Sequence, residues 1–215
     1  MSDITIKPVQ NKSQLNQFIR FAWEINSEDP NWEAPLMMDR QKVLDREKNP
    51  FFKHSEAEFF MAYRNGKLVG RIAAIVNHRH NEFQKDNAGF FGFLEAIDDP
   101  SVFEALLDTA RKWLKEHKKD FMMGPMNPST NDEIGILIDG FDTPPYFMMT
   151  HNPEYYPKVM DTLNYQKVKD VHAFYIDTDT FIMSDKLKSV AEGTKRKMGV
   201  TIRPVEMKKF KSKLE

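Results

Sequence analysis

Residues 124–157 are the part of the sequence best suited to chemistry, because amide and carboxylate side chains alternate there with proline. Asp132 and Glu133 are adjacent carboxylates, and either could accept a proton from an incoming ammonium group. Asn127 and Asn131 lie just before them and could position that group through hydrogen bonds. We therefore interpret this segment as a preorganised polar wall of an acceptor site for an amine or a hydroxyl.

The same segment continues with further candidate binding residues, Asp139, Asn152 and Tyr155. Long loops inside a compact domain are usually functional, and each buried polar group needs a partner to offset its desolvation. We therefore expect several of these side chains to converge with Tyr155 or Tyr156 on one concave surface beside a strand at 121–124. The alternative is that Asn, Asp and Pro only form turns, with their side chains pointing into solvent in scattered directions.

Other catalytic chemistries have little support in the sequence. The absence of cysteine excludes disulfide scaffolds, thiolate metal sites and a cysteine nucleophile. Neither a Gly-x-Ser-x-Gly motif nor a phosphate-binding glycine loop is present. We predict no metal site, because His78 and His80 have no third ligand at a supporting spacing. His151 lies within the polar segment, where it could act as a general base or only cap a turn.

Composition limits the partners further. The 215 residues include 31 Lys and Arg against 32 Asp and Glu, a net charge of -1, so we expect no binding of nucleic acid. No apolar run approaches the roughly 18 residues that span a bilayer, and residues 1–4 lack the layout of a signal peptide. We expect a cytoplasmic protein without a transmembrane segment, although peripheral contact with a membrane is compatible with this composition.

Periodicity predicts the elements that must position the candidate residues. A short strand at 4–9 precedes a helix that Ser13 would cap. Residues 58–76 alternate on both sides of Asn65-Gly66, which predicts a hairpin with a type I′ turn. One short helix is expected within 29–52.

The second half of the chain continues this alternation of strands and helices. A strand at 89–96 leads to a helix that starts at Asp98-Asp99-Pro100, because Asp before Pro is a strong start signal. A strand at 121–124, a helix at 156–163 and a final strand or strand pair at 168–176 complete the pattern. The order predicts an α/β (α+β) fold with a mixed, mostly antiparallel central sheet flanked by helices.

This layout resembles the GCN5-related N-acetyltransferase (GNAT) superfamily, through the Asn-Gly hairpin followed by strand, long helix, strand and helix. The runs at 48–52, 124–133, 139–145 and 152–156 resemble more narrowly a bacterial GNAT-like family related to bacterial ceramide synthases. The resemblance covers residues 4–177. It implies transfer of an acyl group from a thioester to an amine.

Two positions depart from the superfamily pattern. Residues 96–101 (Ala-Ile-Asp-Asp-Pro-Ser) stand where the superfamily normally places the loop that binds the coenzyme A pyrophosphate, so acetyl-CoA or acyl-CoA is expected as co-substrate without this motif. Met160 stands where the superfamily often has a tyrosine general acid. Tyr156 lies one turn earlier and could take that role, or it could be only a core or rim aromatic.

The chain is predicted to contain one GNAT-like domain at 1–177, a linker or solvated helix at 178–199, and the start of a second, truncated repeat at 200–215. The repeat is suggested by Val200-Thr201-Ile202-Arg203-Pro204-Val205, which matches Ile4-Thr5-Ile6-Lys7-Pro8-Val9 with conservative changes only. A chance match between two strands that each precede a proline is the alternative. A repeat would imply a second GNAT-like domain in a longer chain.

The sequence thus favours an N-acyltransferase that moves an acyl group from acyl-CoA or acyl carrier protein to a small-molecule amine, for example a lipid precursor. The alternative is a catalytically degenerate GNAT fold that serves as a ligand-binding or assembly module.

Overall fold

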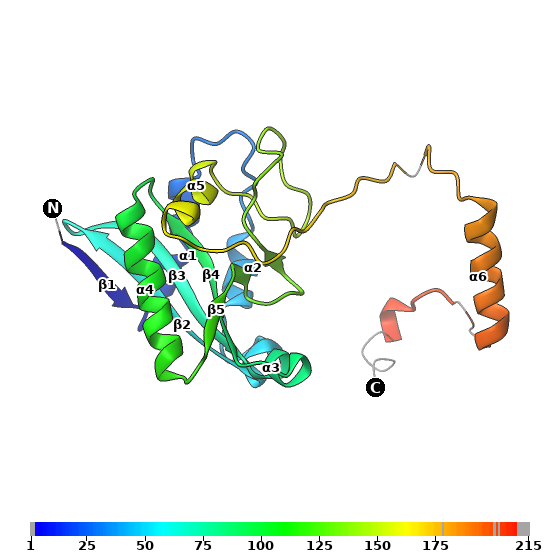
Figure 1. Ribbon diagram of the computed structural model, residues 1–215, viewed down its shortest axis with the longest axis horizontal. Coiled ribbons are helices and arrows are strands. Elements are labelled where there is room, and N and C mark those ends of the chain that lie inside the picture. The colour runs from blue at the N-terminus through cyan, green and yellow to red at the C-terminus, as the bar shows by residue number, and fades with distance from the viewer. Residues whose placement is uncertain (1–2, 178, 200, 202, 210–215) are drawn as a thin grey trace. The chain divides into compact units, whose positions relative to one another are not determined.

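The computed structural model describes residues 3–177, 179–199, 201 and 203–209, and it divides them into two compact units, Met1–Asp170 and Val171–Glu215. The first unit is built on a five-stranded sheet in the order β1-β2-β3-β4-β5 (Figure 1). Its strands are β1 (Ile4–Pro8), β2 (Ser55–Arg64), β3 (Lys67–Asn77), β4 (Ala88–Ala96) and β5 (Phe121–Met123). All neighbours are antiparallel except β4 and β5. The predicted fold class is therefore confirmed.

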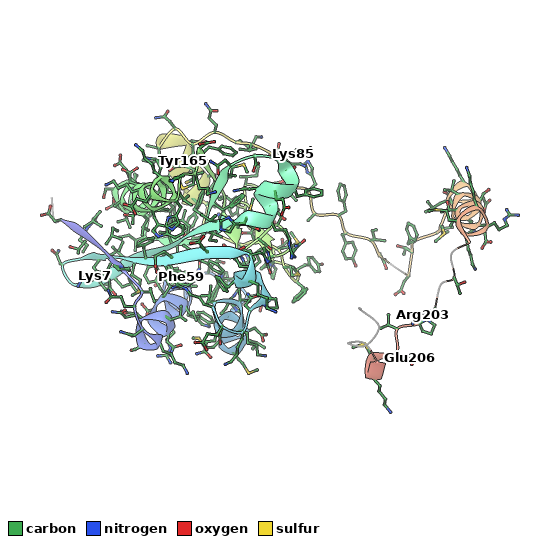
Figure 2. All side chains as sticks on the ribbon, turned by 90° about the horizontal axis from the view of Figure 1, so that it is seen from below. Lys7, Phe59, Lys85, Tyr165, Arg203 and Glu206 are labelled. Atoms are coloured by element: carbon green, nitrogen blue, oxygen red, sulfur yellow. The ribbon has the colours of Figure 1, made fainter. Side chains whose placement is uncertain are left out.

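Helices cover both faces of this sheet. Helix α4 (Pro100–Glu116) and α5 (Tyr155–Thr162) pack on one face, where Phe103 and Leu106 are fully buried. Helix α1 (Lys12–Ile25) packs on the other face through Phe18 and Ile19, and Leu44, just after α2 (Met37–Val43), joins the same cluster. Figure 2 shows the sheet edge-on between these two layers.

Short elements complete the first unit. They are the 3₁₀ helix η1 (Pro50–Lys53), α3 (His78–Gln84), and a two-stranded sheet of β6 (Met126–Asn127) and β7 (Glu133–Ile134). The predicted polar segment thus carries its own small sheet, in which Asn127 pairs with Glu133.

Local signals predicted several elements correctly. The hairpin turns at Asn65 and Gly66, whose φ angles are 51° and 77°, and Asp99 caps α4 directly before Pro100. The predicted cap of α1 was wrong: the cap is Asn11, whose side chain accepts a hydrogen bond from the backbone N–H of Gln14. Asn and Ser are comparable caps, so the choice depends on where the helix begins, and here the capping side chain lies three residues before the N–H that it binds.

The predicted final strand or strand pair at 168–176 was also wrong. The structure shows no strand there, and the side chains of Val168, Phe174 and Tyr175 are exposed. Alternating apolar residues form a strand only where a neighbouring strand pairs with them, and none of the described strands pairs with this segment.

The second unit contains α6 (Asp185–Met198) and η2 (Met207–Lys209). Ser184 caps the start of α6, Gly199 ends it in a left-handed conformation, and no side chain of the helix is buried. Val200, Ile202 and residues 210–215 of the expected repeat lie outside the described residues, so the repeat stays a prediction. Among the described residues, no helix has both the length and the apolar character needed to cross a bilayer.

Candidate active site

A cavity of about 100 Å³ lies in the first unit, where the polar segment covers the middle of β3, the end of β4 and the side of α1. Its floor carries Arg71 from β3 and Glu95 from β4, which are direct partners across the two strands. The register shifts next to this pair, and Phe93 takes a positive φ of 49°. This register shift is a β-bulge, which changes the direction in which side chains point, so it helps to place Glu95 at the cavity.

Arg71 is almost completely buried, with 7% of its surface exposed. Its Nη2 lies 3.6 Å from Glu95 Oε1, and its Nη1 donates hydrogen bonds to the carbonyl oxygens of Phe18 (2.6 Å) and Ile19 (3.2 Å) in α1. No described residue accepts a hydrogen bond from Nε of Arg71. This side chain therefore connects the floor of the cavity to the backbone of α1.

Glu95 is held by a second partner, Tyr156 of α5. The Tyr156 hydroxyl donates to Glu95 Oε2 over 2.8 Å and accepts from the backbone N–H of Ala96 over 3.1 Å. Burial raises the pKa of Glu95 above its ordinary value, although Arg71 and the Tyr156 hydroxyl oppose that rise. Burial and the nearby Glu95 charge raise the pKa of Tyr156 well above its usual value, so its hydroxyl keeps its proton. Glu95 is therefore a carboxyl group of increased basicity at the bottom of a cavity.

A second ion pair forms the wall. Arg40 of α2 binds Glu133 of β7, and both side chains are only partly exposed. Asn127 also lines the cavity, and its Oδ1 accepts a hydrogen bond of 2.6 Å from the backbone N–H of Phe93. The small sheet of the polar segment is thereby fixed to the bulge of β4.

The third part of the wall is a histidine–aspartate pair. His151 Nε2 lies 2.8 Å from Oδ2 of Asp29, which is 122 residues away in the loop after α1. The His151 side chain is 4% exposed and lines the cavity. Burial acts to raise the pKa of Asp29, but hydrogen bonds from His151 and from the backbone N–H of Asn31 outweigh it and lower the pKa. Asp29 is therefore a carboxylate at neutral pH.

Apolar side chains form the remaining wall. Trp23 and Trp32 meet edge to face with ring centroids 5.8 Å apart, and Leu44, Ile136 and Met149 also line the space. The cavity therefore combines a charged floor with a partly aromatic side.

The structure brings together four of the eight residues predicted from the sequence, Asn127, Glu133, Asn152 and Tyr156. Asn152 is buried and accepts a hydrogen bond from the backbone N–H of Leu137 over 2.7 Å, which shapes the loop before α5.

The other four predicted residues do not line the cavity. Asp132 accepts a hydrogen bond from Ser129 Oγ, Tyr155 donates to the backbone carbonyl of Ala96, and Asn131 and Asp139 are exposed. These four agree with the alternative that the polar residues of this segment only form turns or support the structure. Their polar groups contact the backbone, a neighbouring hydroxyl or solvent.

Sequence reasoning missed Arg71, Glu95, Arg40 and Asp29. Arg71 and Glu95 do carry a signal, because each is a charged residue in a strand that is otherwise almost entirely apolar. A charge at such a position is costly unless it is paired, so it indicates a partner or a site. Asp29 carries no comparable signal, since its partner is remote in sequence.

The start of α4 differs from an anion-binding helix end. The Asp99 side chain accepts from the backbone N–H of Ser101, and Arg64 binds the same carboxylate at 2.7 Å. The hydrogen bonds from Ser101, followed by those from Arg64, lower the pKa of Asp99. A carboxylate thus occupies the place where a pyrophosphate would meet the helix amides.

We expect an Asp99→Asn variant to lose about 1 kcal/mol of unfolding free energy at neutral pH, because Asn keeps the cap but not the charge that Arg64 binds. The pKa of Asp99 is lower in the folded state than its unfolded value near 4, so ionised Asp99 stabilises the fold fully above about pH 4. This contribution disappears as the pH falls through the pKa of the folded state. The difference between wild type and variant should therefore shrink below about pH 4.

Urea unfolding at pH 7 and at pH 3 measures this difference. Asp108→Asn on the exposed side of the same helix is the matched control, since its pair with Arg111 is largely solvated. A difference that stayed constant between the two pH values would contradict the assignment to Asp99.

Comparison with known proteins supports the relationship inferred from the motifs. No family model matches the chain. "Bacterial ceramide synthase" of Caulobacter vibrioides (strain NA1000 / CB15N) is 35% identical over 217 residues, which cover 100% of this chain and 56% of that protein. The chain is a homologue of this bacterial ceramide synthase. This similarity confirms the relationship to bacterial ceramide synthases that the sequence motifs predicted.

A second relative, "Protein YghO" of Escherichia coli (strain K12), is 35% identical over 210 residues, covering 98% of this chain and 53% of that protein. The chain therefore spans about half the length of the curated relatives it matches. Among solved structures, it is similar to the aminoglycoside acetyltransferase meta-AAC0020 from an uncultured soil metagenomic sample (12% identity, 81% of this chain, 97% of that chain, TM-score 0.49). It is also similar to a ribosomal-protein-alanine N-acetyltransferase from Brucella melitensis biovar Abortus 2308 (14% identity, 81% and 99%, TM-score 0.45).

Proposed function

We propose that this chain carries the acceptor site of an N-acyltransferase, which transfers an acyl group from an acyl thioester to a primary amine. The observation that carries the proposal is the Arg71–Glu95–Tyr156 network at the floor of a cavity, in a homologue of bacterial ceramide synthase. The donor would be acyl-CoA or acyl carrier protein. The acceptor would be an amine with a long apolar substituent, because Trp23 and Trp32 lie beside the charged floor.

The chemistry requires proton acceptors. An alkylammonium has three N–H bonds and the amide product has one, so two protons leave the nitrogen while the C–N bond forms and the C–S bond breaks. One of these two protons finally protonates the thiolate, and the other is released. Glu95 is better suited than Glu133 to take the proton lost during attack, because Glu95 has a raised pKa whereas Glu133 is paired with Arg40. Tyr156 holds the Glu95 carboxylate in place.

The test uses the purified full-length protein with an acyl-CoA and, in a parallel reaction, an acylated carrier protein. Primary alkylamines of increasing chain length serve as acceptors. We expect equal amounts of amide and free thiol, detected by mass spectrometry and a thiol reagent, with kcat/KM rising as the alkyl chain grows. An absence of amide with every donor and amine, together with tight binding of the amine, would favour the degenerate ligand-binding module instead.

Glu133 is expected to act as a counter-charge for the incoming ammonium. A Glu133→Gln variant should lower kcat/KM at least about tenfold, because Arg40 is then left as an unpaired positive charge beside the amine. The unfolding free energy should change by no more than about 1 kcal/mol, since both side chains are partly exposed. Glu154→Gln, which breaks an exposed pair with Lys158, is the matched control and should leave both quantities unchanged.

A further inference from the structure

The two protons that leave the amine need two acceptors, and the network at the cavity floor supplies only Glu95. The remaining carboxylates are poorly placed for the second transfer. Glu133 is paired with Arg40, Asp132 accepts the Ser129 hydroxyl outside the cavity, and Glu33 is exposed at the rim. His151 is the remaining proton acceptor on the cavity wall.

The geometry at His151 fixes its tautomer. A carboxylate can only accept a hydrogen bond, so the contact of 2.8 Å between Asp29 Oδ2 and Nε2 places the hydrogen on Nε2. In the neutral ring the lone pair then lies on Nδ1. No described residue forms a hydrogen bond with Nδ1. The ring is therefore left with one basic nitrogen that no side chain or backbone group uses.

The pair is also held rigidly on both sides. Thr150 Oγ1 donates to the carbonyl of Gly135, and Asn152 exchanges hydrogen bonds with Leu137, so both neighbours of His151 are fixed to residues 135–137. On the Asp29 side of the pair, the Asn31 side chain donates a hydrogen bond to the backbone carbonyl of Phe141 over 3.0 Å. A histidine that only capped a turn would need neither a carboxylate from 122 residues away nor this support.

We propose that His151 is a catalytic residue that takes the first proton from the acceptor ammonium through Nδ1, and that Asp29 is the positioning residue that holds its ring. The step converts R–NH₃⁺ and neutral His151 into R–NH₂ and protonated His151, whose new charge Asp29 stabilises. The neutral amine then attacks the thioester carbonyl. His151 releases its proton to solvent after the product leaves. This role rests on the proposed acyl transfer.

Charged and titratable groups around the ring bear on its pH dependence. Asp29 contacts Nε2 of the ring. The other titratable and charged groups that line the cavity together with His151 are Glu33, Arg40, Arg71, Glu95, Glu133 and Tyr156. Because the proposed step needs an unprotonated Nδ1, kcat/KM should fall in acid. Glu95 must also be ionised, so the variants below separate the two groups.

The experiment measures kcat/KM between pH 5 and 9 for the full-length wild type and for His151→Gln, Asp29→Asn and His80→Gln. We expect His151→Gln to lose at least about 100-fold in kcat/KM at pH 7. The variant should also flatten the acidic limb, the part of the pH profile in which kcat/KM falls toward acid. Asp29→Asn should lose at least about tenfold and shift that limb. His80→Gln is the matched control, because His80 also faces an aspartate, Asp86, but lies outside the cavity, and its activity should stay within about twofold.

Ring nitrogen chemical shifts of His151 supply a readout that does not depend on the folding of any variant. They should show Nε2 protonated and Nδ1 unprotonated in wild type above neutral pH. A hydrogen on Nδ1, or a His151→Gln variant with wild-type activity and an unchanged acidic limb, overturns the inference. A wild-type protein that transfers no acyl group contradicts the proposed function itself, and with it this role.

Discussion

A Glu95→Gln variant is expected to lower kcat for N-acyl transfer by about 10² to 10⁴, because it removes the proton acceptor at the cavity floor while preserving its shape. The same change leaves Arg71 buried without its counter-charge, so the unfolding free energy should fall by about 3 kcal/mol. Activity and stability therefore decrease together in the single variant.

A double variant, Glu95→Gln with Arg71→Met, separates the two effects. Removing both charges should restore much of the lost unfolding free energy, because no uncompensated charge stays buried. It should not restore kcat. Urea unfolding and steady-state kinetics on wild type, Glu95→Gln, Arg71→Met and the double variant measure this cycle. Recovery of activity in the double variant would show that Glu95 acts only through stability.

Gly92→Ala is expected to disrupt the site where β4 meets β6. A Cβ atom at this position would lie 1.7 Å from the carbonyl oxygen of Met126 and 3.0 Å from Oδ1 of Asn127. The backbone of β6 must therefore move away, which breaks the hydrogen bond between Asn127 and the Phe93 N–H. Since Asn127 pairs with Glu133, that carboxylate moves too.

We expect this variant to lose about 2 kcal/mol of unfolding free energy and at least about 100-fold in kcat/KM, as a displacement near 1 Å in an active site commonly causes. Gly193→Ala is the matched control, because a Cβ there meets no atom within 4 Å. In helix α6 this substitution should leave activity unchanged and favour the helix by about 1 kcal/mol. Wild-type activity in Gly92→Ala would mean that the position of β6 has no influence on the reaction.

The elements that sequence alone predicted correctly are those that local chemistry determines. The Asn65-Gly66 turn and the Asp99-Pro100 helix start depend on a few adjacent residues, and both are confirmed. Segment 168–176 has an equally clear alternating pattern, yet it forms no strand. A strand depends on a partner elsewhere in the chain, and no local pattern contains that information.

The candidate site follows the same division. The composition of the polar segment is visible locally, and four of its predicted residues, Asn127, Glu133, Asn152 and Tyr156, line the cavity. Which other groups face them depends on tertiary contacts. The pairing of His151 with Asp29 joins positions that share no local pattern, so only the folded chain reveals it.

The contacts of Arg71 have a consequence for how the site responds to substrate. The same guanidinium group faces Glu95 and holds the Phe18 and Ile19 carbonyls of α1, the helix from which Ile19, Ala22 and Trp23 line the cavity. A change of charge on Glu95 alters the electrostatic field at Arg71 and hence the strength of its hydrogen bonds to the helix backbone. We therefore expect a change in the protonation state of Glu95 to be transmitted through this single side chain to α1 and to the wall of the cavity that α1 forms.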